Sequence, residues 1–434
     1  MLLYSTSITP RLQYIVDFCS PLIAGSGMTI TDNKDFFIQS EETKINYSAE
    51  VIEGNILHII PHYLLFEKCI KKQETECFVF ENQKAFFKTN GDFPFDIFAA
   101  IFYLMSRYEE YLPHEKDAYG RFAHTHSIAG KEGFLHLPLV NIWLQELVKT
   151  LQQKFTNYTP PNLSFSFVPT YDIDEAFSFR YKSFWRKAGG ATKDFLWGNW
   201  KKIILRLQVL RQQINDPYHS FDWIDALNKK YQLQPVYFFL VAKNRSRFDK
   251  NISPHKKAMQ EILKAHCEKY KVGIHPSWQS GDDESLLQEE LQVLESIGNQ
   301  KITHSRQHYI RFTLPETYRT LLAAGITFDF SMGYGSINGF RASVASPFYW
   351  YDLEKEESTA LLLYPFCVMD ANSFYEENLT ASAAVAEMKK YLQAVKNVNG
   401  CFISIWHNTF LGTDAVFAGW REAYEDLVKE AVGA

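Results

Sequence analysis

The chain has 434 residues, of which 46% are hydrophobic and 22% charged, and its net charge is −5 at pH 7. This composition is typical of a folded globular protein, excludes a largely disordered chain, and allows roughly two or three domains. The slightly negative charge also excludes the general basic character of nucleic-acid-binding proteins, so we expect no nucleic-acid partner.

The sequence shows no sign of export or membrane insertion. The six cysteines contain no C-x-x-C pair and are expected to be reduced thiols. The first residues, MLLYSTSITPRLQYIVDF, lack the basic start, apolar run and cleavage site of a signal peptide. No run of about 18 apolar residues is present to form a transmembrane helix. We therefore expect a cytoplasmic protein.

Residues 1–160 are predicted to form a smaller α/β domain of unknown role. Apolar residues at helical or alternating spacing define its elements. The Thr159-Pro160-Pro161-Asn162 segment breaks the pattern, and the domain boundary is placed there. The predicted helices are Arg11–Phe18, Phe95–Tyr111 and Leu137–Phe155, and the predicted strands are Val51–Ile60 and Cys77–Phe80.

Residues 161–434 alternate between short apolar strands and longer amphipathic stretches. This alternation predicts a distorted or incomplete (β/α) barrel of about seven parallel strands. A doubly wound open sheet is the alternative, although no G-x-G-x-x-G or Walker pattern supports nucleotide binding in it. The predicted strands are Ser164–Tyr171, Pro235–Val241, Lys271–His275, Ile302–His308, Thr327–Ser331, Ala360–Phe366 and Cys401–His407. The predicted helices are Asp222–Lys230, Ala258–Lys269, Glu284–Ile297, Thr317–Ala324 and Ala381–Val398.

Two carboxylates, Asp172 and Asp174, end the first of these strands in the stretch SFSFVPTYDIDE. Alternate side chains of an extended chain share a face, so both carboxylates point the same way. Like charges held together are costly unless a cation or a proton lies between them. The pair therefore predicts a metal site, while a strand-end cap with a salt-bridge partner is the structural alternative.

Further polar side chains follow the later strands, at the edge where a βα barrel carries its chemistry. They are His275 after the third strand, Arg306 and His308 after the fourth, Asp329 after the fifth, Asp370 after the sixth and His407 on the seventh.

Five short motifs occur in a fixed order along this region: TYDID, VGIHPS, SRQHY, DFS and IWH. In this order the region from about 163 to 425 resembles the polysaccharide deacetylase family, carbohydrate esterase family 4 of NodB type. Residues 1–160 have no counterpart in the core of that family. They resemble the N-terminal extension found on uncharacterised bacterial members.

The resemblance implies a role for each matching residue. Asp172 would be the general base that activates water, and Arg306 would orient it. Asp174 and His275 would be metal ligands, and His407 would be the general acid. The cofactor implied is a divalent metal, with zinc expected.

One position departs from the family pattern. The family carries a second histidine four residues after the first, where this chain has Gln279. A neutral amide oxygen is a poor zinc ligand, and catalytic zinc usually has three histidine or carboxylate ligands. We expect His308, at the end of the fourth predicted strand, to supply the third ligand.

The function implied is a metal-dependent hydrolase that deacetylates an N-acylated sugar in a polysaccharide or glycolipid precursor, with a carbohydrate as its substrate. The departure at Gln279 leaves open a catalytically inactive carbohydrate-binding protein. The Asp-x-Asp pair also leaves open a glycosyltransferase, which would need a nucleotide-binding half that the sequence does not reveal.

Residues 180–211 form a basic window with nine Lys and Arg and a single acid, Asp194. The window also contains Trp185, Trp197 and Trp200. A basic helix with tryptophan suggests peripheral contact with an anionic membrane or a lipid-phosphate-linked sugar. A solvated helical insertion packed on the barrel is the alternative.

Overall fold

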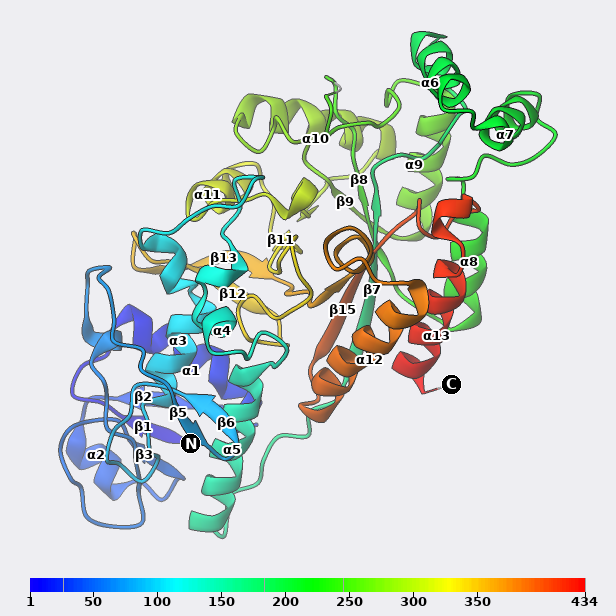
Figure 1. Ribbon diagram of the computed structural model, residues 1–434. Coiled ribbons are helices and arrows are strands. Elements are labelled where there is room, and N and C mark those ends of the chain that lie inside the picture. The colour runs from blue at the N-terminus through cyan, green and yellow to red at the C-terminus, as the bar shows by residue number, and fades with distance from the viewer. Residues whose placement is uncertain (26, 183, 245, 434) are drawn as a thin grey trace.

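The computed structural model describes residues 1–25, 27–182, 184–244 and 246–433, without the side chains of residues 184–187 and 191. The N-terminal region contains a small parallel sheet of strand order β2-β1-β3-β4, drawn in blue in Figure 1. Its strands are β1 (Leu2–Tyr4), β2 (Thr29–Thr31), β3 (Lys44–Asn46) and β4 (Leu57–His58).

Helices and one hairpin complete this region. The helices are α1 (Pro10–Ile23), α2 (Lys34–Gln39), α3 (Ile97–Met105), α4 (Ile128–Lys131) and α5 (Leu139–Lys154), and β5 (Phe78–Phe80) pairs with β6 (Gln83–Ala85). Every residue of α3 is buried, as expected for a helix that is apolar on all sides. The predicted strand Val51–Ile60 is mostly wrong, because only Leu57–His58 pairs with β3.

The C-terminal region is built on a nine-stranded sheet of order β12-β13-β11-β10-β9-β8-β7-β15-β14. All neighbouring strands are parallel except β12, which is antiparallel to β13. Each of the seven predicted strands overlaps an observed one, and β12 and β14 were not predicted. The strands are β7 (Ser166–Ile173), β8 (Val236–Phe239), β9 (Lys271–Ile274), β10 (His304–Ser305), β11 (Phe328–Asp329), β12 (Phe348–Asp352), β13 (Glu357–Leu363), β14 (Val368–Met369) and β15 (Cys401–His407).

The sheet curls without closing among the described residues. The strands β13 and β14 lie near opposite edges in the strand order, yet β13 ends at Leu363 and β14 begins at Val368. Five peptide steps span at most about 19 Å, so the two edges must approach one another. The structure is therefore a mixed α/β fold with a strongly curved sheet, and the predicted barrel is incomplete.

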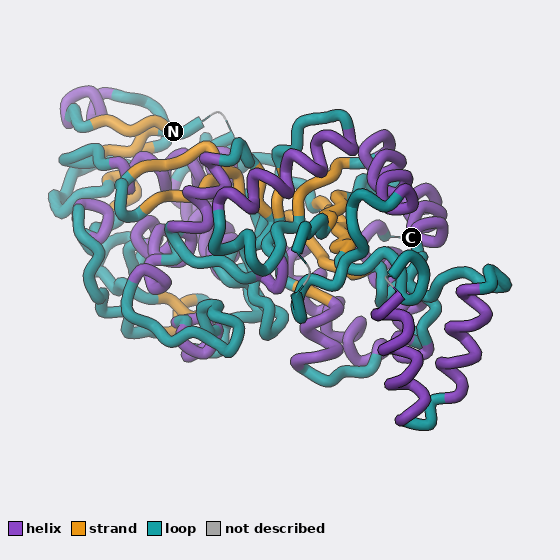
Figure 2. Tube along the Cα trace, turned by 90° about the horizontal axis from the view of Figure 1, so that it is seen from above, coloured by secondary structure: helices purple, strands orange, loops and turns teal. Residues whose placement is uncertain are grey.

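Helices surround this sheet on its outer side (Figure 1). They are α8 (Phe221–Lys230), α9 (Lys257–Lys269), α10 (Glu284–Gly298), α11 (Glu316–Ala323), α12 (Ala381–Asn397) and α13 (Trp420–Val432). The five helices predicted for this region coincide with α8 to α12. Between β7 and α8 the chain forms two further helices, α6 (Phe184–Leu196) and α7 (Trp200–Leu210), which project from the body (Figures 1 and 2).

One hydrophobic core runs through both regions, and ion pairs join them. Arg341, in the long connection after β11, pairs with Glu110 of the N-terminal region, and Arg11 of α1 pairs with Glu356 beside β13. The core includes Leu12 and Phe102 from the first region and Trp350 from the second. The domain boundary at residue 160 stays a prediction.

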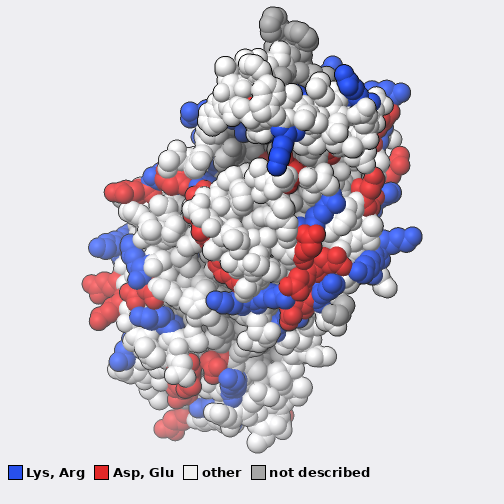
Figure 3. Space-filling model, turned by 45° about the vertical axis from the view of Figure 1, so that its right-hand side comes forward, with Lys and Arg blue, Asp and Glu red and all other residues white. Residues whose placement is uncertain are grey.

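Basic and acidic side chains are interspersed over the face of the molecule seen in Figure 3, with broad uncharged areas between them. Within the described part of the chain, no helix combines the length and apolar character needed to cross a membrane.

Candidate metal centre

The parallel strands bring the predicted site residues to one edge of the large sheet. Asp174 directly follows β7, His275 directly follows β9, and His407 is the last residue of β15. Asp172 and His407 are register partners on the neighbouring strands β7 and β15. Since parallel strands end on the same side, side chains far apart in the sequence converge there.

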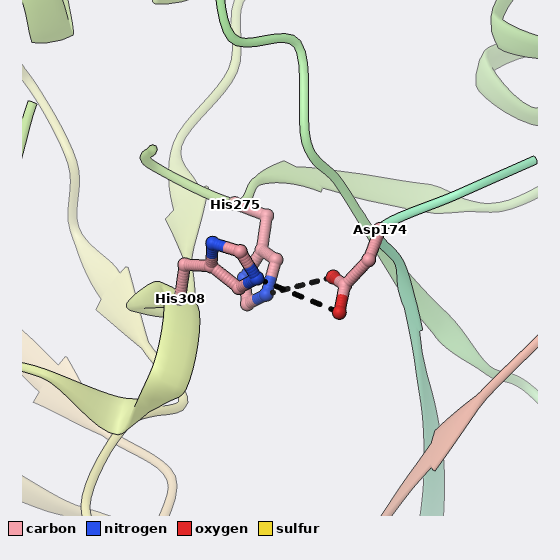
Figure 4. Close-up of side chains that lie close together, drawn as sticks. All are labelled: Asp174, His275 and His308. Carbon is pink, nitrogen blue, oxygen red and sulfur yellow. Dashed lines mark ion pairs between the residues drawn. The ribbon is translucent and has the colours of Figure 1, made fainter. Parts of the chain in front are cut away.

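Asp174, His275 and His308 form a compact cluster, with one ligand atom from each lying within 4.8 Å of the others. The Oδ1 atom of Asp174 is 3.3 Å from Nε2 of His275, and its Oδ2 atom is 3.5 Å from Nε2 of His308. Figure 4 shows both imidazole rings pointing toward the Asp174 carboxylate. We refer to these three residues as the triad.

Both histidines of the triad are oriented by a hydrogen bond at the opposite ring nitrogen. The Nδ1 atom of His275 lies 2.6 Å from the carbonyl oxygen of Arg306, and Nδ1 of His308 lies 3.0 Å from Oδ1 of Asp249. A carbonyl can only accept, so Nδ1 of His275 carries the hydrogen and its Nε2 offers a lone pair. Histidines that bind metal commonly have such a partner, which fixes the ring orientation.

The triad fits a divalent metal on three grounds. Among the described residues, the buried Oδ1 atom of Asp174 has no hydrogen-bond partner, although a buried carboxylate oxygen normally has one. The oxygen–nitrogen separations of 3.3 and 3.5 Å match the edge of a tetrahedron with ligand bonds of about 2.0–2.1 Å, which is about 3.3 Å. Two imidazoles and one carboxylate are also a ligand set that zinc takes in catalytic sites.

The charge balance of the triad depends on its protonation. Burial would raise the pKa of Asp174, but His308, His275 and His407 outweigh it and hold that pKa well below its ordinary value. Burial lowers the pKa of His308, but the Asp174 and Asp249 carboxylates raise it to about 9. His308 therefore holds a proton at neutral pH, which a metal ion must displace in order to bind.

Asp172 lies next to the triad and is held by Arg306. The Nη1 atom of Arg306 donates to Oδ1 of Asp172 at 2.8 Å and to the hydroxyl of Thr170 at 2.7 Å. Its Nε donates to the carbonyl oxygen of Phe330 at 3.0 Å. The second carboxylate oxygen of Asp172 lies 3.8 Å from Nε2 of His275. Arg306 thus anchors one oxygen of Asp172 and leaves the other facing the triad.

His407 lies next to the triad at the end of β15, the strand that pairs with β7 on the side opposite β8. Its Nε2 atom is 3.8 Å from Oδ2 of Asp174, and its Nδ1 is 2.6 Å from Oδ1 of the buried Asp370. Burial lowers the pKa of His407, but Asp370 foremost, together with Asp174 and Asp172, raises it to about 10. The imidazole is therefore protonated and can donate a proton through Nε2.

Several predicted positions have other roles. Gln279 is exposed, and Asp329 is buried and accepts hydrogen bonds from Ser305 and Ser331. The predicted strand Ile302–His308 is wrong in length, because β10 ends at Ser305. His308 instead begins a short 3-10 turn, followed by Tyr309 with a φ of 59°. His304 stacks on Phe328 and does not belong to the triad.

Sequence reasoning missed Asp249 and assigned no role to Asp370. Asp249 is fully buried and accepts hydrogen bonds from the backbone of Trp278 and the hydroxyl of Ser246 as well as facing His308. It lies in the loop between β8 and α9. No pattern in the sequence marks Asp249, because it lies well beyond the end of β8.

Comparison with known proteins gives a family match for the first region and structural likenesses for the second. Residues 1–156 match a family described as a family of unknown function, DUF7033. A comparison with curated proteins finds no match.

The solved structures with some likeness to the chain include deacetylases and a pseudoenzyme. A Mycobacterium smegmatis protein described provisionally as a polysaccharide deacetylase is 12% identical, with a TM-score of 0.40 over 63% of this chain and 86% of that one. The Bacillus cereus polysaccharide deacetylase is 10% identical, with a TM-score of 0.32 over 61% of this chain and 88% of that one. A Bacillus anthracis CE4 family pseudoenzyme is 11% identical, with a TM-score of 0.29 over 61% and 62%. At such values the chemistry of this chain has to be judged from its own site geometry.

Proposed function

We propose that the protein is a metal-dependent hydrolase that removes an acyl group from an N-acylated sugar. The observation that carries this proposal is the arrangement around Asp174. The triad is suited to a divalent ion. Two further residues flank it: Asp172, whose carboxylate is held by Arg306, and His407, whose imidazole is held by Asp370. A Lewis acid, a general base and a general acid are together suited to hydrolyse an amide.

Each flanking residue has a defined step in the hydrolysis. Asp172 takes a proton from water as the water oxygen forms its bond to the acyl carbon. His407 then gives its proton to the sugar nitrogen as the carbon–nitrogen bond breaks, so that a free amine and a carboxylic acid result. Arg306 aims the Asp172 carboxylate through a charge-assisted hydrogen bond.

A divalent ion held by Asp174, His275 and His308 would supply Lewis acidity, polarising the acyl carbonyl and making water more acidic. Zinc is the metal proposed, because two imidazoles and a carboxylate suit it better than the all-oxygen sites of magnesium or calcium. Asp249 orients His308 in this assignment and touches no substrate.

Metal content and acetate release from N-acetylglucosamine oligomers test the proposal together. Purified wild-type protein should contain one zinc ion per chain and release acetate. Asp174→Ala should lose both properties, whereas Asp172→Asn should retain the metal and lose at least about 100-fold in kcat, the range of a general base. Sugar binding without metal would instead indicate an inactive carbohydrate-binding protein. Metal that persists in a variant carrying both Asp174→Ala and His275→Ala would contradict the proposed centre.

A further inference from the structure

The helical hairpin formed by α6 and α7 exposes an unusual amount of apolar surface. At its turn, Leu196 is 75% exposed and Trp197 is 79% exposed. Along α7, Trp200, Ile204 and Leu207 are exposed as well, and their spacing of four and then three residues places them on one face of the helix. An apolar stripe of this kind normally faces a protein core, but the residues of this stripe are exposed to solvent.

The two helices contact each other through an ion pair and through a ring contact between Phe195 and Trp200. Arg206 of α7 is largely buried and pairs with Asp194 of α6 at 2.6 Å, while its guanidinium carbon lies 4.6 Å from the ring centre of Phe179. A side chain at Gly190 would come within 2.8 Å of this guanidinium. The packing therefore fixes Arg206 inward, which turns the opposite, apolar face of α7 outward.

Basic side chains border the apolar stripe. Asp194 is the only acid between residues 193 and 211, and Arg206 pairs with it. Lys193, Lys201 and Arg211 are exposed, and Lys202 is half-buried. Among the described side chains of the hairpin, these four cations have no carboxylate partner, because Asp194 pairs with Arg206. Tryptophan beside lysine and arginine is the combination that binds the interface of a membrane containing anionic lipid.

The hairpin also lies on the side of the sheet that carries the metal centre. It begins at Phe184, shortly after Asp174 leaves the carboxyl end of β7, and Figure 1 shows it beyond that end of the strands. Figure 2 shows the two helices projecting freely from the body. A surface bound by the hairpin would therefore face the edge of the sheet where Asp172 and Asp174 lie. Ser183 and the side chain of Trp185 lie outside the described residues.

We propose that the α6–α7 hairpin docks the protein on an anionic lipid bilayer, with Trp197, Trp200, Ile204 and Leu207 entering the interface. The bilayer then lies on the side of the metal centre, and the substrate is an N-acylated sugar carried on a lipid. The docking stands on the hairpin alone, whereas the substrate class rests on the proposed hydrolase function.

Flotation with vesicles tests the docking without any turnover. Wild-type protein should float with vesicles of phosphatidylcholine and phosphatidylglycerol and bind those of phosphatidylcholine alone much more weakly. Because salt screens exposed charges, binding to the anionic vesicles should fall several-fold in high salt. Equal binding to the two kinds of vesicle, or no binding at low salt, would overturn the proposal.

Two hairpin variants identify the contributing side chains. A triple variant with Trp197→Ser, Trp200→Ser and Leu207→Ser, and a double variant with Lys201→Glu and Lys202→Glu, should each bind anionic vesicles at least about ten-fold more weakly. The control carries Val51→Ser and Val79→Ser, which replace exposed apolar residues of the N-terminal region, and should bind like wild type. Unchanged thermal unfolding shows that the variants remain folded.

The wild-type protein is also tested for self-association without vesicles. If it self-associates and the triple variant does not, the stripe binds a second copy of the chain and not a bilayer.

The substrate class needs a separate measurement. An N-acetylglucosaminyl lipid in anionic vesicles is compared with a soluble N-acetylglucosamine oligomer. The triple variant should lose at least about ten-fold in activity on the lipid and keep its activity on the oligomer, since interfacial anchoring affects only the vesicle-borne sugar. Equal losses on both would overturn the substrate assignment. If Asp174→Ala still floats with vesicles, docking is independent of the metal centre, so failure of one proposal leaves the other testable.

Discussion

Asp370 holds His407 by two hydrogen bonds, one from Nδ1 at 2.6 Å and one from the backbone N–H at 2.7 Å. Asp370 is fully buried, and burial raises its pKa, although its hydrogen bonds with His407 oppose the rise. The two bonds fix the ring so that Nε2 faces Asp174. The Asp370 carboxylate therefore both aims the proposed general acid and keeps it protonated.

Replacing Asp370 by asparagine should shift the pH profile of the enzyme. The pKa of His407 is raised to about 10, chiefly by Asp370 against the effect of burial, so without this carboxylate it should fall toward its ordinary value. A general acid must be protonated, hence the alkaline limb of kcat should move to lower pH, with a larger loss at pH 8 than at pH 6. The profile of kcat against pH measures this, and the loss at pH 8 should be roughly 10- to 100-fold.

The control for this variant is Asp282→Asn, which removes an exposed carboxylate that pairs with Arg311 at the surface. It should leave the profile unchanged. A uniform loss of kcat at every pH in Asp370→Asn would show that Asp370 only supports the structure. Zinc content should stay at the wild-type level, because neither His407 nor Asp370 belongs to the triad.

Asp249→Asn should weaken metal binding. The carboxylate of Asp249 orients His308 through Nδ1, and partners of this kind typically contribute 10- to 100-fold in metal affinity. Competition with a chelator, followed by metal analysis, should give a zinc affinity lower by about that factor. At saturating zinc, kcat should recover most of its value. A wild-type zinc affinity in Asp249→Asn would mean that His308 is not a ligand.

The residues predicted from the sequence lie at the end of a strand or shortly after it. Asp172, Asp174 and His275 are recognisable because β7 and β9 are apolar strands with polar ends, and parallel strands end together. Asp249 has no such signal, since it lies well beyond the end of β8 and reaches His308 only through the path of its loop. Linear patterns predict where strands end, whereas the partners in loops depend on the tertiary fold.

The end of the fourth strand and the orientation of Arg206 in the hairpin also depend on the tertiary fold. The sequence pattern predicted a fourth strand that reaches His308, but β10 ends at Ser305. The backbone N–H of Gln307 donates to the hydroxyl of Ser331 instead of to a neighbouring strand. In the hairpin, basic residues and tryptophans were visible in the sequence. The inward direction of Arg206 was not, because it depends on Asp194 and on the ring of Phe179.

Gly273→Ala should disturb the centre through packing. Gly273 lies in β9, two residues before His275, and an added Cβ would come within 2.6 Å of the Phe238 ring and 2.8 Å of the His304 carbonyl oxygen. The Phe238 ring lies 4.5 Å from the Arg306 guanidinium, so its displacement would move the residue that holds Asp172. We expect a loss of about 1–3 kcal/mol in unfolding free energy, typical of overpacking, together with lower kcat.

The matched control is Gly133→Ala, where an added Cβ meets no atom within 4 Å, although its φ of 77° adds local strain. It should leave kcat unchanged even if stability falls slightly. Denaturant unfolding and kcat are measured on both variants. Gly273→Ala with wild-type kcat would show that the position of Arg306 does not depend on this contact.

The buried ion pair between Glu110 and Arg341 should make the join between the two regions sensitive to acid. Burial would raise the pKa of Glu110, but Arg341 and Arg107 lower it to about 2. Because this pKa lies below the ordinary value of 4.5, the stabilisation is fully present above pH 4.5 and is lost as pH falls toward 2. The difference corresponds to about 3 kcal/mol.

Glu110→Gln should therefore lose about 3–5 kcal/mol of unfolding free energy at neutral pH, the cost of leaving a buried arginine without its partner. Below pH 4.5 the gap between wild type and variant should narrow, because the wild type loses the same ion pair. Glu425→Gln, which breaks the exposed pair with Lys230, should lose less than about 1 kcal/mol. Urea unfolding at several pH values measures all three proteins. A gap that stays constant down to pH 3 would show that the pKa of Glu110 is not depressed in the folded protein.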